Sequence, residues 1–176
     1  IGKYAFSNCN ILESVKLPNN ITYISKFSFS YCMKLTSIAI PNSVTSIHKG
    51  AFVQCSGLTS IAFHNKLTSI CYQAFVGCSG LKSITIPDSI TFIDSYAFLD
   101  CENLTSVTYN GTSDPGKNSK SVFSGCRSLK EINLPADYKD EEFCDKFLPA
   151  KLKRIKIIVS VVGAVVIIAV VTGIVI

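Results

Sequence analysis

The chain has 176 residues and a mass of 19.1 kDa, which suits one domain of ordinary size plus a short additional segment. Only 16% of the residues are charged, and the net charge of +5 has a local origin. The segment Lys146–Lys156 holds five of the 17 basic residues, so acidic and basic residues balance over the rest of the chain. A neutral body of this kind argues against nucleic-acid binding, which needs a basic surface to neutralise phosphates.

Several residue types recur at a fixed interval of 23 positions, which indicates a tandem repeat. One column holds Phe6, Phe29, Phe52, Phe75 and Phe98, and another holds Cys9, Cys32, Cys55, Cys78 and Cys101. A leucine column and an Ile/Val column keep the same interval. A sixth copy, with Phe123 and Cys126, follows after 25 residues, and its two extra residues fall in the Gly/Pro/Ser/Asn-rich loop 110–120.

The unit Val44–Lys66 shows how one repeat is built. Leu58, Ile61 and Phe63 have the spacing of a strand that points alternate side chains inward, and Val44–Ile47 forms a second extended segment. A short helical or 3-10 turn is expected around Phe52. Because one unit cannot bury its own apolar edge, neighbouring units must stack. The sequence therefore predicts a solenoid of parallel strands over residues 1–137, with about six repeats and a shared core of Phe29, Phe52, Phe75, Phe98, Cys32, Cys55, Cys78 and Cys101.

The repeated strings IPNSVTSIHKGAFVQCSGLTSIAF and IPDSITFIDSYAFLDCENLTSV resemble the leucine-rich repeats of BspA-like surface proteins of bacteria and parasitic protists. The resemblance covers about Ile1–Asp137 and implies a curved leucine-rich-repeat solenoid on a cell surface, with a role in adhesion or host binding. Ser28, in place of Ala, and His64, in place of Pro, depart from the pattern. The resemblance carries over no ligand site, because such repeats are a scaffold for many functions.

The cysteines and histidines predict no catalytic or metal centre. Six cysteines share one column, as expected of small buried side chains, and they lack the paired spacing of zinc ligands. Cys71 and Cys144 lie outside that column, and their disulfide state stays open. His48 and His64 occupy different columns without a nucleophile or metal motif. We therefore expect no catalytic residue, no metal, no cofactor and no enzymatic activity.

The C-terminal segment, residues 138–176, predicts a cap and a membrane span. Residues 138–156 are expected to cover the last coil with Tyr138, Phe143 and Phe147 and to end in a basic segment, while the acidic residues around Asp140 lack calcium-loop spacing. The uncharged run Ile157–Ile176, at about 1.5 Å per residue, would span a bilayer as one α-helix. Basic residues before the run favour a cytosolic flank, whereas the family resemblance favours exterior repeats; we expect the exterior.

One row of exposed strand positions forms the candidate binding face: Thr36, Ser37, Thr59, Ser60, Lys82, Ser83, Thr105 and Ser106. Lys82 is the charged member of this row and a candidate contact for an anionic group. Sequons at Asn20, Asn103 and Asn110 are possible glycosylation sites.

The functional hypothesis is a single-pass protein of the cell membrane that mediates adhesion or macromolecular binding. Its partner would be a protein or a glycan on another cell, and no nucleic acid is expected. Two alternatives stay open: a surface-coat repeat without a dedicated ligand, and a tail-anchored scaffold with cytosolic repeats. The oligomeric state is not predicted.

Overall fold

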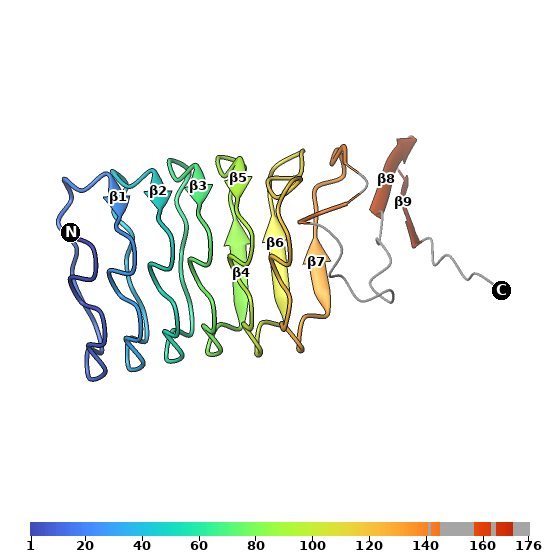
Figure 1. Ribbon diagram of the computed structural model, residues 1–176. Helices are drawn as coiled ribbons and strands as arrows, with labels where there is room; N and C mark the ends of the chain where they lie inside the picture. Colours follow the sequence, from blue (N-terminus) through green and yellow to red (C-terminus); the bar gives the residue numbers. More distant parts are fainter. Residues whose placement is uncertain (141, 145–156, 163–164, 171–176) are drawn as a thin grey trace.

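The chain winds into coils that stand side by side, and successive coils repeat the same path (Figure 1). The computed structural model describes residues 1–140 and 142–144, and the backbone of 157–162 and 165–170. One parallel sheet has the strand order β1 (Tyr23–Ile24), β2 (Ser46–Ile47), β3 (Ser69–Ile70) and β5 (Phe92–Ile93). A second parallel sheet has the order β4 (Ser83–Ile86), β6 (Ser106–Tyr109) and β7 (Glu131–Asn133). The predicted leucine-rich-repeat solenoid of parallel strands is confirmed.

Strand pairing places each residue beside its counterpart in the next repeat. Ile47 pairs with Ile70, and Ile84 pairs with Val107. Along β4, Ile84 and Ile86 are buried while Ser83 and Thr85 are exposed, as the two-residue period of a strand requires. Each column of the sequence is therefore a physical stack along the solenoid.

The expected helical or 3-10 turn at the phenylalanine corner is wrong, because the described residues contain neither. Alternate backbone N–H groups serve different coils there. Ala51 N–H and Val53 N–H donate to His48 and Gly50 carbonyls in their own coil, at 3.1 Å each. Phe52 N–H and Gln54 N–H instead donate to the next coil, to the Ala74 and Val76 carbonyls at 2.8 and 2.7 Å. A 3-10 helix would keep all of these bonds within its own coil.

This alternation needs two residues per coil with positive φ. Gly50 has a φ of 62° and Gln54 one of 57° in the coil of Phe52. The two positive-φ columns are Tyr4, Phe27, Gly50, Gln73, Tyr96 and Ser121, and Asn8, Tyr31, Gln54, Gly77, Asp100 and Gly125. A non-glycine residue pays about 1–2 kcal/mol for this backbone shape, and the bonds to the next coil offset that cost.

The phenylalanine column forms a continuous ring stack through the core. Neighbouring rings from Phe6 to Phe123 have centroids 5.1–5.5 Å apart and planes within 10° of parallel. The four central rings are completely buried: Phe29, Phe52, Phe75 and Phe98. The stack fills the space between coils that no single coil could fill.

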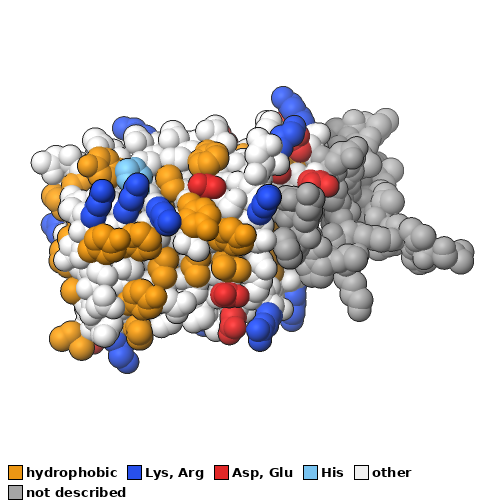
Figure 2. All heavy atoms as spheres, viewed as in Figure 1, with side chains coloured by type: hydrophobic (Ala, Val, Ile, Leu, Met, Phe, Trp, Pro, Cys, Tyr) orange, Lys and Arg blue, Asp and Glu red, His pale blue; other side chains and the backbone are white. Residues whose placement is uncertain are grey.

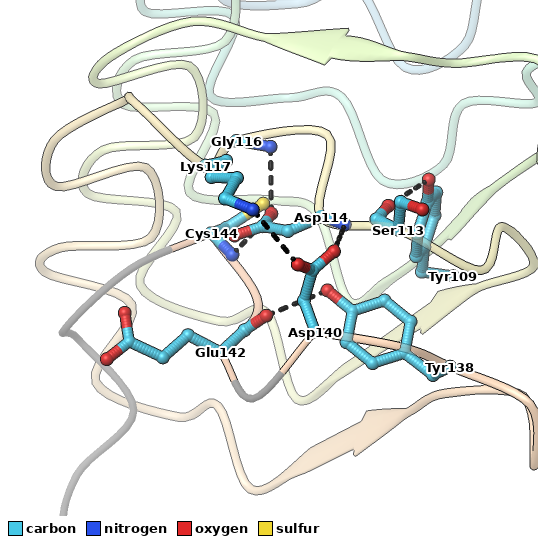
Figure 3. Close-up of polar contacts among 9 residues, drawn as sticks. All are labelled: Tyr109, Ser113, Asp114, Gly116, Lys117, Tyr138, Asp140, Glu142 and Cys144. Atoms are coloured by element: carbon cyan, nitrogen blue, oxygen red, sulfur yellow. Dashed lines mark hydrogen bonds and ion pairs between the residues drawn. The ribbon is translucent and has the colours of Figure 1, made fainter.

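The enlarged loop 110–120 docks onto the segment around residues 138–144 (Figure 3). Asp114 N–H donates to Asp140 Oδ2 at 2.7 Å, and Cys144 N–H donates to Asp114 Oδ1 at 2.9 Å. Lys117 Nζ lies 3.3 Å from Asp140 Oδ1, so this carboxylate is held in place rather than simply solvated. A Cβ at Gly116 would meet Cys144 Sγ at 2.9 Å, so the two segments touch too closely for a side chain there.

Aromatic residues of the same segment extend the core. Phe143 is buried and its ring lies 6.1 Å from that of Phe123, so the ring stack continues beyond the last copy. Half-buried Tyr138 packs against Phe143 and Tyr109. Phe147, also expected to point inward, lies outside the described residues.

The C-terminal apolar run differs from the expected single helix. Its backbone forms β8 (Ile157–Val162) and β9 (Val165–Val170), an antiparallel pair in which Ile157 is opposite Val170. Val and Ile are β-branched, and this branching favours extended backbone over helix. In the described part of the chain, no helix combines the length and the apolar character that a membrane crossing requires. Residues 145–156, 163–164 and 171–176 lie outside the described residues.

Replacing Phe75 tests the ring stack. Phe75→Ala should lower the free energy of unfolding by about 3–5 kcal/mol, because it opens a cavity between two coils. Phe6 is only partly buried and has one ring neighbour, so Phe6→Ala should cost clearly less. Urea unfolding followed by circular dichroism measures both values. Equal losses would contradict a one-dimensional stack.

Ser28 is a position at which a substitution should stabilise the protein, because it is a buried serine in a column where most other repeats have alanine. Its side chain is completely buried, and its Oγ has no hydrogen-bond partner among the described residues. Ser28→Ala should raise the free energy of unfolding by about 1 kcal/mol, since an unsatisfied buried hydroxyl carries a desolvation cost. The matched control Ala74→Ser should destabilise. A destabilising Ser28→Ala would show that this hydroxyl has a partner.

Candidate binding surfaces

The predicted binding face is an exposed wall, which we call the threonine wall: Thr36, Ser37, Thr59, Ser60, Lys82, Ser83, Thr105 and Ser106. All are exposed except Ser106, which is half-buried. Thr59 Oγ1 donates to the Thr36 carbonyl at 3.3 Å, and Thr105 Oγ1 donates to the Lys82 carbonyl at 2.9 Å. These hydroxyl protons already serve bonds between coils, so the uniformity of the column has a structural cause. A partner could therefore bind these hydroxyl groups only by donating hydrogen bonds to the remaining lone pairs of their oxygens.

The three sequon asparagines are all exposed. Asn103 Nδ2 donates to the Ser79 carbonyl of the preceding coil at 2.8 Å. A glycan on Asn103 would have to be accommodated around this bond between coils.

A second wall, beside the sheet β1–β2–β3–β5, was not predicted as a binding face. Three exposed lysines occupy one repeat column there, and we call them the lysine stripe: Lys3, Lys26 and Lys49. Figure 2 shows basic side chains beside a histidine and between hydrophobic side chains on the N-terminal part of this face. Their constant interval of 23 residues was visible in the sequence. The predicted binding face instead followed the strand column that contains Lys82.

A neighbouring column brings His48, Cys71 and Asp94 onto successive coils. This is not an activated nucleophile, because burial and then the charge of Asp94 raise the pKa of the Cys71 thiol, whereas catalysis needs a lowered one. His48 instead stacks on Tyr23, with ring centroids 4.8 Å apart. Burial, followed by the nearby charge of Lys26, lowers the pKa of His48. All three side chains are half-buried, and Ser25, in the same column, is buried.

His64 lies in a turn, at the position where most other repeats have proline. Its Nδ1 accepts a hydrogen bond from Lys66 N–H at 3.2 Å, which gives it a local structural role. Across the described residues, no group of three or more His, Cys, Asp or Glu side chains could hold a metal ion.

The column cysteines are free thiols with a specific packing role. Cys55 Sγ donates to the Phe29 carbonyl at 3.0 Å, and Cys78 Sγ donates to the Phe52 carbonyl at 3.0 Å. The same bond, to the carbonyl of the phenylalanine in the preceding coil, recurs at Cys32, Cys101 and Cys126. Burial, with a smaller contribution from Cys32, raises the pKa of Cys55 to about 12. The position thus requires a small apolar side chain that can donate one weak hydrogen bond.

Comparisons with known proteins agree with this architecture. The family model for the BspA type leucine rich repeat region matches the chain in six copies, over residues 1–105 and 54–161. A leucine rich cell surface protein from Faecalibacterium prausnitzii has a TM-score of 0.63 and 37% identity over 69% of this chain. The T. pallidum leucine rich repeat protein has a TM-score of 0.68 and 32% identity over 76% of it. The pneumococcal vaccine antigen PcpA has a TM-score of 0.61 and 27% identity over 74%.

This chain corresponds to only part of each of these structures. It covers 32% of the F. prausnitzii protein, 61% of the T. pallidum protein and 32% of PcpA. No curated protein is a significant match to the chain. The comparisons therefore concern the repeat region that the chain shares with these proteins.

The thiol geometry predicts strong protection from alkylation. At pH 8 a thiol with a pKa of about 12 is ionised in only about one molecule in 10,000, and Cys55 is also completely buried. Iodoacetamide should label half-buried Cys71 in the native protein at least tenfold faster than Cys55, and urea should abolish the difference. Peptide mass spectrometry measures both rates. Equal native rates would contradict the buried-column assignment.

Proposed function

The chain belongs to the family of BspA-type leucine-rich repeat proteins, and on this premise we propose that it is a cell-surface protein that binds a macromolecular partner. Similarity to a leucine rich cell surface protein supports the location, although the chain covers 32% of that protein. The observation that carries the proposal is the pair of exposed walls, in which Thr36, Thr59, Lys82 and Thr105 on one side and Lys3, Lys26 and Lys49 on the other occupy successive coils. Such walls suit an extended partner rather than a small molecule in a closed pocket.

Membrane anchoring through Ile157–Ile176 is part of this proposal. The run has 20 residues without a charge, which matches the thickness of a bilayer when helical. In a bilayer core, no water satisfies the backbone polar groups, and a helix satisfies them within one segment. We therefore propose that lipid converts the β8–β9 segment into a single spanning helix, with the repeats outside the cell.

A surface coat without a dedicated ligand is the second candidate. The observation that favours it is the threonine wall, whose hydroxyl bonds between coils explain its uniformity without any partner. The threonine wall also remains a candidate contact face, with Lys82 as its exposed charge. The two candidates predict different results when the chain is displayed on cells: a binding protein should increase adhesion, and a surface coat should not.

Protease treatment of intact cells tests location and binding together. Cells express the full chain with one tag before the repeats and another after Ile176. External protease should remove the first tag and leave the second, and the displayed chain should increase adhesion to an epithelial monolayer. Survival of both tags on intact cells, with cleavage only after lysis, would indicate cytosolic repeats and overturn the proposal.

The adhesion result separates binding from coating. Surface display without any gain in adhesion would favour the coat. If adhesion is gained, the variant Thr36/Thr59/Thr105→Glu tests the threonine wall, with Thr36/Thr59/Thr105→Ser as the control that keeps the hydroxyls. Loss of adhesion in the first variant alone would assign contact to this wall.

A further inference from the structure

The lysine stripe is held in a fixed geometry by the backbone beneath it. Tyr4 N–H donates to the Lys26 carbonyl at 3.2 Å, and Phe27 N–H donates to the Lys49 carbonyl at 3.0 Å. Coils that pair in this way are about 4.8 Å apart, so the three lysines cover about 10 Å along the solenoid. Their charges therefore form a short linear array rather than a diffuse basic surface.

Among the described residues, no ion pair neutralises the charges of the stripe. The ion pair found among the described residues joins Lys117 and Asp140, at the other end of the solenoid. Like charges on neighbouring strands repel, so this column costs stability instead of contributing to it. An external anion would remove the repulsion, which gives the column a reason to bind one.

Aromatic rings flank the stripe and are partly open to solvent. Tyr4 stacks on Phe27 with centroids 5.3 Å apart, and Tyr23 stacks on His48 at 4.8 Å. Tyr4 is 58% exposed and Tyr23 is 46% exposed. Lys49 Nζ lies 5.0 Å from the centroid of the Tyr72 ring, a cation–π contact that restrains this lysine. Flat amphipathic rings beside point charges can contact both the apolar face and the anionic groups of a sugar chain.

We propose that the lysine stripe and its flanking aromatic rings bind a sulfated glycan chain. An acidic polypeptide fits less well, because an extended peptide repeats same-side groups about every 6.6 Å, whereas the lysines repeat about every 4.8 Å. Lysine offers a compact charge without the bidentate geometry of arginine, which suits sulfate groups of variable orientation. This inference rests on the proposed surface function, since a surface protein meets such glycans on other cells.

Heparin binding by the full chain in detergent micelles tests the proposal. Lys3/Lys26/Lys49→Gln should weaken heparin affinity by about tenfold or more and reduce the slope of log affinity against log salt by about two to three. The control Lys34/Lys66/Lys139→Gln removes the same charge from exposed lysines outside both walls and should change affinity less than about twofold. Matching thermal unfolding curves verify that both variants fold.

The aromatic contribution has its own variant. Tyr4/Tyr23→Ala should weaken heparin binding several-fold without changing the salt slope, because it removes ring contacts and no charge. Desulfated heparin should bind the parent chain at least about tenfold more weakly than heparin. Equal losses in the stripe and control lysine variants would overturn the proposal, as would absent heparin binding. Equally tight binding of polyglutamate would point to an acidic protein instead.

Adhesion assays distinguish this inference from the proposed function. If displayed chains adhere but heparin does not compete and the stripe variant adheres normally, the glycan inference fails while surface binding stands. If the stripe binds heparin but protease shaving places the repeats in the cytosol, the proposed surface function fails while the binding chemistry stands.

Discussion

Every column of this protein depends on backbone N–H groups that donate to the neighbouring coil instead of to their own. The bonds from Phe52 to Ala74 and from Gln54 to Val76 are examples, and equivalent bonds run along the whole solenoid. They set one coil beside the next without a shift in register. Phenylalanine rings of neighbouring coils therefore stack, and column thiols donate to the carbonyl of the phenylalanine in the preceding coil, as Cys78 does to Phe52. The same constraint places lysine beside lysine, where the contact is unfavourable.

The two walls respond differently to this constraint. On the threonine wall, a hydroxyl reaches the carbonyl of the preceding coil, so the column satisfies itself. On the lysine stripe, stacking multiplies a charge that no described acidic residue pairs with. Repetition thus adds hydrogen bonds between coils on the threonine wall, whereas on the lysine stripe it leaves charges without a described partner. The Cys55 thiol belongs to the first kind, because it donates to the Phe29 carbonyl and burial raises its pKa to about 12.

The parallel solenoid and its core were predictable because phenylalanine, cysteine and leucine each mark a position that only certain shapes can fill. The corner was not, since positive φ falls on residues as different as Gln54 and Tyr96, whose side chains carry no signal for that backbone. The lysine stripe had a sequence signal in its interval, but only the structure shows that these lysines form no ion pair with a described residue. The apolar run shows a different limit. Hydropathy reports length and polarity, while Val and Ile suit a helix in lipid and a strand outside it.

Because the coils are so similar, a coil can pair with the wrong neighbour during folding. A chain that skipped one repeat would still place phenylalanine on phenylalanine, and looping out one unit adds an entropy cost that grows only slowly with loop length. The loop 110–120 is unlike every other connection, because Asp114 binds both Gly116 N–H and Cys144 N–H there. A chain that skipped the coil next to this loop would lose the bond between Asp114 and Cys144, whereas a skip between two identical connections would lose no such bond. Pairing errors are therefore penalised most at this end of the solenoid.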